Sequence, residues 1–306
     1  MTGDYRAQTK DALDRTAILV LVVLCASWGL QQVTIKIANQ GISPVWQSGI
    51  RSIGATILLL IWMAVRRQPL MEKDGTLRYG IAAGLLFAVE FLLIFRGLEF
   101  TNASRAVVFL YLSPFAVAAG AHLFIPGEKL RGIQVAGLCC AFAGVVAVFH
   151  ESLSFPTHRM LIGDGMLTAA ALLWGATTVL IKASPLSRIA PGKTLLYQLA
   201  VSAVVLPLGS LAMGEPGIVQ LTPLIIGCLV YQTVWVAFVT YLAWFWLVRH
   251  YPASRLASFT FLTPVFGVIA GATLLHEPIT SMLLLALVLV GTGIYLVNRP
   301  ASGPGW

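Results

Sequence analysis

Charged residues are scarce in this chain of 306 residues. Only 10% of the residues are Asp, Glu, Lys or Arg, whereas 58% are hydrophobic. A soluble domain carries roughly a quarter charged residues, and one globular core could not enclose so much apolar surface. The composition therefore predicts an all-α membrane protein whose apolar surface is covered by lipid.

Recognisable catalytic motifs are also missing. The sequence has no GxSxG, no GxxxxGK[ST] loop, and no HExxH, since His276-Glu277 is followed by Pro278 without a second histidine. The four cysteines (Cys25, Cys139, Cys140 and Cys228) lie in apolar runs without the spacing of a disulfide framework or a zinc site. We therefore predict no catalytic residue, no metal and no cofactor. A channel stays open as an alternative, because pores need no signature beyond their lining residues.

Long uncharged runs divide the chain into ten expected membrane spans. Arg15 and Lys36, for example, enclose 20 uncharged residues (16–35), which is the length needed to cross ~30 Å of hydrocarbon as a helix. The runs are continuous rather than alternating, so a β-barrel is excluded. The expected spans are 17–38, 45–65, 77–98, 102–125, 130–149, 164–183, 192–213, 221–248, 252–275 and 279–298.

The basic residues predict the orientation of these spans. With the N-terminus inside, the cytoplasmic segments hold 15 of the 20 Lys and Arg residues, as the positive-inside rule requires. We thus expect cytoplasmic tails at 1–16 and 299–306, and read the net charge of +8 as a topology signal and not as a nucleic-acid site. The first span follows a basic segment as a signal peptide would, but we expect it to be retained because it belongs to a repeat.

Two parts of the sequence repeat across the segment 150–163, which we interpret as a linker. WGLQQVTIK, which starts at Trp28, matches WGATTVLIK, which starts at Trp174. A second motif, Ala-Ser-Arg, is followed by Leu-Ser-Pro ending at Pro114 and, 150 residues later, by Leu-Thr-Pro ending at Pro264. The sequence therefore predicts a first repeat at 17–149 and a second at 164–298, each of five helices. An odd number of helices per repeat inverts one repeat relative to the other, as in many transporters that alternate their access.

These motifs resemble the drug/metabolite transporter superfamily, in its ten-helix branch with two EamA repeats. The resemblance covers residues 17–298, and within the family the chain is most similar to the YddG-type exporters of aromatic amino acids. It implies export of small metabolites from the cytoplasm across the inner (plasma) membrane, through a central cavity lined by both halves. Amino acids, aromatic ones or threonine, are the expected substrates. Besides the substrate and the bilayer we expect no nucleic-acid partner, and a monomer or weak dimer.

Glu90 stands out as an acidic residue in the middle of the third span. A charge at that depth costs about 2.5–3.5 kcal/mol or more, so it usually faces a cavity or a partner. Glu90 is expected either to contact a substrate amine, to exchange a proton, or to serve as a protonated structural residue. Polar Gln31, Gln32, Gln232 and Thr233 could recognise the amino-acid backbone or bond between helices.

Aromatic residues could stack against an aromatic substrate in the cavity. In the eighth span Tyr231, Trp235 and Phe238 share one face by their α-helical spacing. Interfacial anchoring is the competing explanation for each ring, so we expect about half of them to line the cavity. Three further candidates come from other spans: Trp28, Tyr111 and Trp174.

Two groups of residues are candidates for gating. Arg96 and Arg105, with Glu99, cluster near the outer ends of the third and fourth spans and could close the cavity, although a plain interfacial salt-bridge set fits equally. Pro114 and Pro264 lie in the middle of their spans at matching positions of the two repeats. Each proline removes a backbone hydrogen bond and could serve as a hinge.

Overall fold

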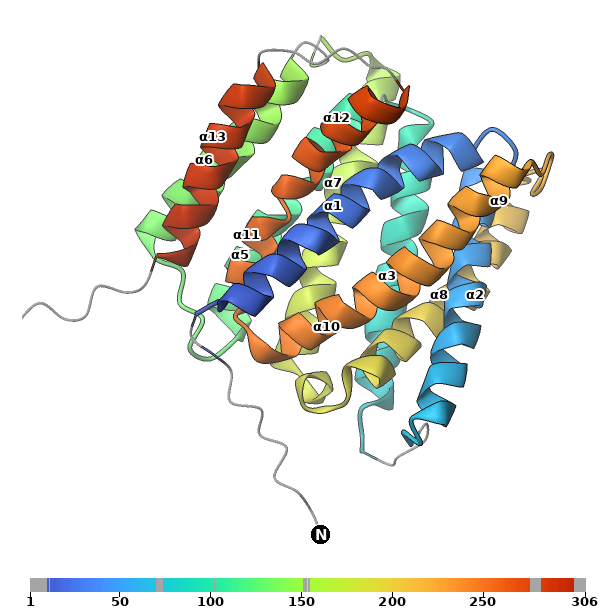
Figure 1. Ribbon diagram of the computed structural model, residues 1–306, viewed down its shortest axis with the longest axis horizontal. Helices are drawn as coiled ribbons and strands as arrows, with labels where there is room; N and C mark the ends of the chain where they lie inside the picture. The colour runs from blue at the N-terminus through green and yellow to red at the C-terminus, as the bar shows by residue number, and fades with distance from the viewer. Residues whose placement is uncertain are drawn as a thin grey trace, which may run out of the picture.

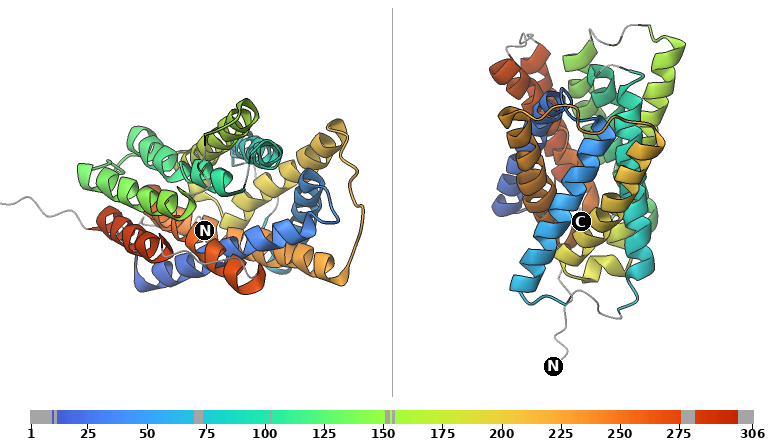
Figure 2. Two further views of the ribbon diagram at one scale, coloured as in Figure 1. Left: turned by 90° about the horizontal axis from the view of Figure 1, so that it is seen from above. Right: turned by 90° about the vertical axis from the view of Figure 1, so that its right-hand side faces the viewer.

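The protein is a bundle of helices, which we describe from a computed structural model. The structure describes residues 10, 12–69, 74–101, 103–150, 153, 155–275 and 282–299. Its α-helices are α1 (Arg15–Ala38), α2 (Pro44–Val65), α3 (Leu77–Leu98), α4 (Ala103–Leu110), α5 (Ser113–Phe124), α6 (Gly132–Phe149), α7 (His158–Ala183), α8 (Pro191–Ala212), α9 (Pro223–Val230), α10 (Tyr241–His250), α11 (Ala253–Phe259), α12 (Leu262–Leu275) and α13 (Met282–Asn298). A 3₁₀-helix η2 (Pro185–Arg188) follows α7, and a π-helix η3 (Tyr231–Thr240) joins α9 to α10. Figures 1 and 2 show these helices packed as one bundle.

The helices begin where the sequence supplies caps. The side chains of Asp14, Thr157 and Thr222 accept hydrogen bonds from backbone amides in the first turns of α1, α7 and α9. Proline stands in the first turn of α2 and α8, where no amide donor is needed.

The apolar helices confirm a polytopic membrane protein. Within the described residues, nine helical stretches are long and apolar enough to cross a membrane, and the shorter α13 is also apolar. Their outer faces carry large hydrophobic side chains in the open, such as Leu19, Val65 and Leu284, which are 68%, 77% and 71% exposed. Only lipid can cover a continuous surface of this kind.

Most predicted spans agree with the helices, with two differences. The predicted linker 150–163 is shorter, because α7 begins at His158 with the Thr157 cap and takes in its last six residues. Residues 276–281, which include Glu277 and the start of the tenth predicted span, lie outside the described residues.

The first five spans pack against the last five in a reciprocal pattern. Helix α1 packs on α12 while α7 packs on α5, α2 packs on α8, and α6 packs on α13. Figure 1 shows α6 and α13 side by side at one edge of the bundle. Glycines permit the closest approaches: a Cβ on Gly29 of α1 would lie 2.7 Å from the backbone nitrogen of Gly267 in α12. This pattern is what two inverted halves would produce, and the division into halves at 17–149 and 164–298 stays a prediction.

Helix α1 begins, and α13 ends, at the same end of the bundle. We call this the basic end, because Arg66, Arg78, Lys129, Lys193 and Arg249 also lie at the helix ends found there. The other end, where α1 ends and α2 begins, is called the opposite end.

Three interruptions of regular α-helix occur inside the predicted spans. The fourth span breaks at Tyr111-Leu112 between α4 and α5, and the ninth breaks at Thr260-Phe261 between α11 and α12. Each break is followed, after one or two residues, by a predicted proline, with Ser113 standing before Pro114 and Leu262-Thr263 before Pro264. The third interruption is η3, ten residues of π-helix in the eighth span. Long π-helix is rare and is found most often at functional sites.

Candidate functional site

A group of buried polar side chains lies where helices of both predicted halves meet. We call it the polar centre, and all of its members are less than 9% exposed. It consists of Gln31 of α1, Ser48, Arg51 and Ser52 of α2, Glu90 of α3, Gln198 and Ser202 of α8, and Gln232 and Thr240 of η3. Helix α2 packs on α8 and η3, α3 packs on α8, and α1 packs on η3, which brings these elements together.

Arg51 and Glu90 are the charged members of the polar centre. The Arg51 guanidinium lies over the ring of Phe91, 4.5 Å from its centroid, and donates a long hydrogen bond of 3.4 Å to Ser48 Oγ. Arg51 and Glu90 interact electrostatically, and the Tyr241 hydroxyl at the start of α10 interacts with Arg51 and Gln31. Two opposite charges and a phenol thus share one buried region.

Several polar atoms of this region have no hydrogen-bond partner among the described residues. They are Nε and Nη1 of Arg51, Oε2 of Glu90, Oε1 and Nε2 of Gln198, Oγ of Ser202 and Nε2 of Gln232. Leaving one such group unpaired costs about 1–3 kcal/mol, and more when it is charged. A concentration of unsatisfied donors and acceptors is expected of a site that is completed by water or by a polar ligand.

Aromatic rings border the polar centre toward the basic end. Trp28 of α1 meets Trp244 of α10 edge to face at 5.5 Å, and Trp244 stacks on Trp174 of α7 at 5.7 Å. Tyr241 joins the same group, 6.3 Å from Trp28 and 6.0 Å from Phe87. The indole of Trp28 donates a 3.0 Å hydrogen bond to Thr240 Oγ1, which links the rings to the polar centre.

The structure therefore brings only some of the predicted substrate residues together. Glu90, Trp28 and Trp174 lie in the polar centre or its aromatic border. Gln32 does not: it is exposed, and its neighbour Gln31 is the buried one. One residue along an α-helix is a rotation of about 100°, so the sequence alone did not decide between two adjacent glutamines.

The three aromatic candidates of the eighth span lie on η3. The predicted shared face assumed α-helical spacing, whereas this segment is a π-helix with a wider turn. Tyr231 Oη and Trp235 Nε1 donate hydrogen bonds to the backbone oxygen and Oγ of Ser27, at 3.0 and 2.9 Å, and Trp235 is 41% exposed. Phe238 packs edge-on against Trp62 at 6.5 Å.

Tyr111 belongs to a separate region at the break between α4 and α5. Its ring lies 6.2 Å from that of Phe261, at the break between α11 and α12. The two broken spans therefore meet at their irregular points. Discontinuous helices of this kind line the substrate sites of several transporter folds.

The structure gives the predicted cluster of Arg96, Glu99 and Arg105 an additional partner. Arg96 does pair with Glu99, and both are about two-fifths exposed. Arg105, however, forms a buried ion pair with Asp164 of α7, and Thr101 Oγ1 donates a 3.0 Å hydrogen bond to the same carboxylate. Asp164 therefore joins Glu90 as a second acidic residue inside a span, which the later predicted start of that span had obscured.

A related contact lies at the basic end. The carboxylate of Asp14, which caps α1, accepts a 2.8 Å hydrogen bond from Tyr251 Oη. It also forms an ion pair with Lys10 at 2.6 Å. Tyr251 lies 150 residues after Thr101, and Asp164 lies 150 residues after Asp14, so the two ends use matching positions: Thr101 bonds to Asp164 of α7, and Tyr251 bonds to Asp14, the cap of α1. The hydrogen bonds from Lys10, Ala17 and Tyr251 lower the pKa of Asp14 below its ordinary value.

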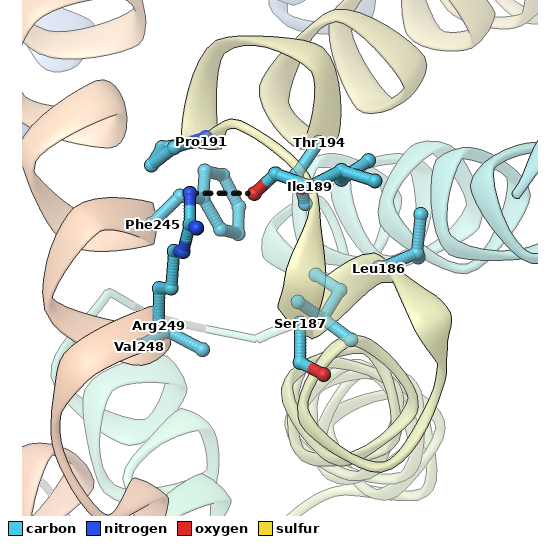
Figure 3. A pocket seen from close by; sticks show the side chains of 9 residues that line it. Leu186, Ser187, Ile189, Pro191, Thr194, Phe245, Val248 and Arg249 are labelled. Carbon is cyan, nitrogen blue, oxygen red and sulfur yellow. Dashed lines mark hydrogen bonds between the residues drawn. The ribbon is translucent and has the colours of Figure 1, made fainter. Parts of the chain in front are cut away.

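Further contacts hold the basic end together. Lys182 Nζ at the end of α7 donates hydrogen bonds of 2.7 Å to the backbone oxygens of Val248 and Tyr251. The Glu128 carboxylate accepts from the amides of Ala253 and Ser254 at the start of α11, at 3.1 and 3.4 Å. Figure 3 shows a small pocket nearby, about 10 Å³, where Arg249 donates to the backbone oxygen of Ile189. It has room for about one water molecule and not for an amino acid.

Two charged residues of the site were not selected from the sequence. Arg51 and Asp164 each interrupt a long apolar stretch, and that signal had selected Glu90. The same signal would have found Arg51 if it had been applied to basic residues, and Asp164 if the sixth span had been given an earlier start. Within the described part of the chain, no group of three or more His, Cys, Asp or Glu side chains is placed to hold a metal.

Comparison with known proteins gives a consistent family. Residues 15–150 and 161–299 both match the EamA-like transporter family. An uncharacterised transporter of Bacillus subtilis, YvbV, is 30% identical over 94% of this chain and 93% of its own. Proteins named "probable amino-acid metabolite efflux pump" in Escherichia coli and Salmonella typhimurium are 28% and 30% identical, over 92% of both chains in each case.

The fold is also found among solved structures. A protein known by crystal structure aligns with a TM-score of 0.78 over 93% of this chain and 97% of its own, at 15% identity. The two family matches cover nearly the whole chain, and the apolar helices fit a multi-pass membrane transporter. The chain belongs to the EamA-like transporter family of the drug/metabolite transporter superfamily.

Proposed function

We propose that this transporter exports amino acids from the cytoplasm, with aromatic amino acids favoured, by alternating access around the polar centre. The observation that carries the proposal is the set of unpartnered polar atoms buried between helices of both predicted halves. The names of two relatives, which describe amino-acid metabolite efflux, support the same substrate class.

The chemistry of the polar centre suits a small zwitterion with a ring. Glu90 supplies a carboxylate for the substrate ammonium group, and Gln31, Gln198 and Gln232 supply amide donors and acceptors. The stacked rings of Trp174 and Trp244 provide an aromatic surface beside these groups. A charged group that enters such a buried site keeps its affinity only if it is paired, which favours substrates that carry matching charges.

Alternating access is supported by the reciprocal packing and by the paired contacts at the two ends. Asp164 with Thr101 and Arg105 closes the opposite end, and Asp14 with Tyr251 closes the basic end. Opening one set of contacts while the other holds would expose the polar centre to one side at a time. Pro114 and Pro264, at the two helix breaks, are the proposed hinges, and Arg96 and Arg105 the proposed gate residues.

The proposed orientation follows the distribution of basic residues. The basic end faces the cytoplasm, so both termini are cytoplasmic in the inner membrane. The repeats 17–149 and 164–298 act as the two moving halves, and a monomer or weak dimer suffices because the polar centre is built within one chain.

The test is uptake by purified protein in liposomes with labelled tryptophan, phenylalanine and threonine, with and without a pH gradient and a membrane potential. Saturable uptake of the aromatic amino acids is the expected result. Uptake that follows an imposed proton gradient would add proton exchange, with Glu90 as the first candidate for the proton site. Uptake of none of the three would contradict the amino-acid assignment, and uptake that does not saturate would favour a channel.

A further inference from the structure

Arg51 is the most completely buried charged side chain among the described residues, and Ser48, Glu90 and Tyr241 beside it leave two of its nitrogens without a hydrogen bond. Its side chain is 1% exposed, eight residues into α2, within an apolar span. A cation at such a depth costs several kcal/mol unless it is paired with hydrogen-bonding anions. The position of Arg51 therefore calls for an acceptor of matching charge.

The neighbours of Arg51 do not supply that acceptor. Nε and Nη1 have no hydrogen-bond partner, and the 3.4 Å bond from Nη2 to Ser48 is at the weak end of the range. Glu90 attracts Arg51 electrostatically, yet its Oε2 is also without a partner, so these atoms do not satisfy each other. The ring of Phe91 holds the guanidinium plane in place but accepts no N–H bond in its plane.

The unpaired nitrogens of the buried Arg51 suit a substrate carboxylate, and the inference rests on the proposed function. We propose that Arg51 binds the carboxylate of the substrate while Glu90 binds its ammonium group, so that the transporter selects free amino acids over their amides, esters and amines. An arginine fork suits a carboxylate, because it donates several N–H bonds to one planar anion. The Tyr241 hydroxyl and Gln31, which both face this region, complete the ring of donors.

The test compares ligands that differ in one charged group. Tryptophan, tryptophanamide and indole-3-propionate have the same indole, but the amide lacks the carboxylate and the propionate lacks the ammonium group. Inhibition of labelled tryptophan uptake is measured in liposomes, and the shift of melting temperature in detergent. Tryptophanamide is expected to bind at least about 100-fold more weakly than tryptophan, because it leaves Arg51 unpaired.

Variants assign the discrimination to Arg51. The double variant R51Q/E90Q removes both charges together, so neither is left unpaired, and it is expected to bind tryptophan and tryptophanamide within about threefold of each other. R78Q, which changes an exposed arginine of α3 that donates a 2.9 Å hydrogen bond to Tyr79 Oη, is the control and should retain the wild-type ratio.

The outcomes separate this inference from the proposed function. Equal binding of tryptophan and tryptophanamide by the wild type would overturn the role of Arg51 and leave amino-acid transport standing. Unchanged discrimination in R51Q/E90Q would also overturn it. If tryptophan, phenylalanine and threonine neither stabilise the protein nor cross the membrane with it, both proposals fall.

Discussion

At the scale of single residues, Glu90 connects the sequence to the mechanism. It is 5% exposed on α3, one of its oxygens has no partner, and Arg51 and Tyr241 lie in the same region. The proposed function assigns this carboxylate a cation to bind or a proton to exchange. The variant E90Q, which keeps the shape of Glu90 but not its charge, distinguishes these roles from a packing role.

We expect E90Q to reduce tryptophan transport at least about tenfold, since a hydrogen bond to a charged group contributes about 1.5–3 kcal/mol. The measurement is initial uptake at several pH values. E99Q, which alters an exposed carboxylate paired with Arg96, is the matched control. Unchanged rates and an unchanged pH profile in E90Q would make Glu90 a structural residue.

The aromatic residues should differ in their effect on specificity. Trp174 stacks on Trp244 next to the polar centre, whereas Trp235 is 41% exposed and bonded to Ser27. We expect W174A to raise the KM for tryptophan about five- to tenfold and the KM for threonine far less, because an aromatic contact contributes about 0.5–1.5 kcal/mol beyond its area. W235A should affect both substrates equally. Equal losses for both substrates in W174A would show that its ring only packs the bundle.

Residue identity could be predicted from the sequence only where a single position stood out. Glu90 is an isolated charge, so its burial in the site was predictable. Gln31 and Gln32 are adjacent and chemically identical, and only the rotation of α1 against η3 decides which one is buried. Asp164 pairs with Arg105 from a distant part of the chain, a contact that no local pattern contains.

At the scale of elements, the broken spans and the two sets of end contacts are the proposed movable parts. Helices α4 and α5, and α11 and α12, divide one residue or two before a proline, where the backbone lacks a donor. The prolines in the sequence predicted these interruptions. The π-helix η3 carries no such signal, because its residues are ordinary helix-compatible ones and its wide turn depends on packing against α1 and α2.

Locking either end should stop transport. We expect a short bismaleimide to cross-link T101C/D164C at the opposite end and D14C/Y251C at the basic end, since each pair replaces side chains joined by a hydrogen bond of 3.0 or 2.8 Å. Uptake should fall to background in both cross-linked proteins, because an end that cannot open ends the cycle.

Each single-cysteine variant and the wild type, treated with the same reagent, control for the native cysteines, of which Cys139 is exposed. Cross-linked protein that still transports at half its former rate or more would show that the end in question does not open.

At the scale of the whole molecule, acidic residues join the two predicted halves at both ends. Asp74, between α2 and α3, pairs with Lys193 at the start of α8 at 2.7 Å. Glu215, between α8 and α9, accepts from the amides of Val45 and Trp46 at the start of α2, at 3.2 and 3.0 Å. At each end, therefore, an acidic residue of one predicted half contacts the start of a helix in the other half.

The Asp74 contact predicts an acid-dependent stability. Burial alone would raise the pKa of Asp74, but hydrogen bonds from Lys193 and Thr76 outweigh it and lower the pKa to about 2. Because this value lies below that of the unfolded chain, the contact stabilises the fold above about pH 4 and is lost as the pH falls toward 2. We expect D74N to melt roughly 2 °C lower than wild type at pH 6. Between pH 4 and pH 2.5 its melting temperature should fall less than that of wild type, because it lacks the carboxylate whose protonation breaks the contact.

The exposed carboxylate of Glu99 provides the control for this measurement, and E99Q should keep the wild-type dependence. A D74N protein with the wild-type melting temperature at pH 6 would show that this contact contributes little to holding the halves together.

The number and positions of the spans could be predicted from the sequence, because lipid permits only long apolar helices and charges mark their ends. The bundle geometry could not, since contacts such as α2 with α8 depend on how side chains of distant helices interlock. The polar centre was predicted in part: its members are polar residues in apolar spans, but which of them meet is decided by the packing of both halves.

Alternating access around the polar centre is tested most directly by counterflow in liposomes. Vesicles loaded with unlabelled tryptophan are diluted into a trace of labelled tryptophan. A carrier that exposes its site to one side at a time should accumulate label transiently far above the level in empty vesicles, because inward-bound label exchanges for outward-bound substrate. Label that only equilibrates, with no overshoot at any internal concentration, would contradict the account and indicate an open pore.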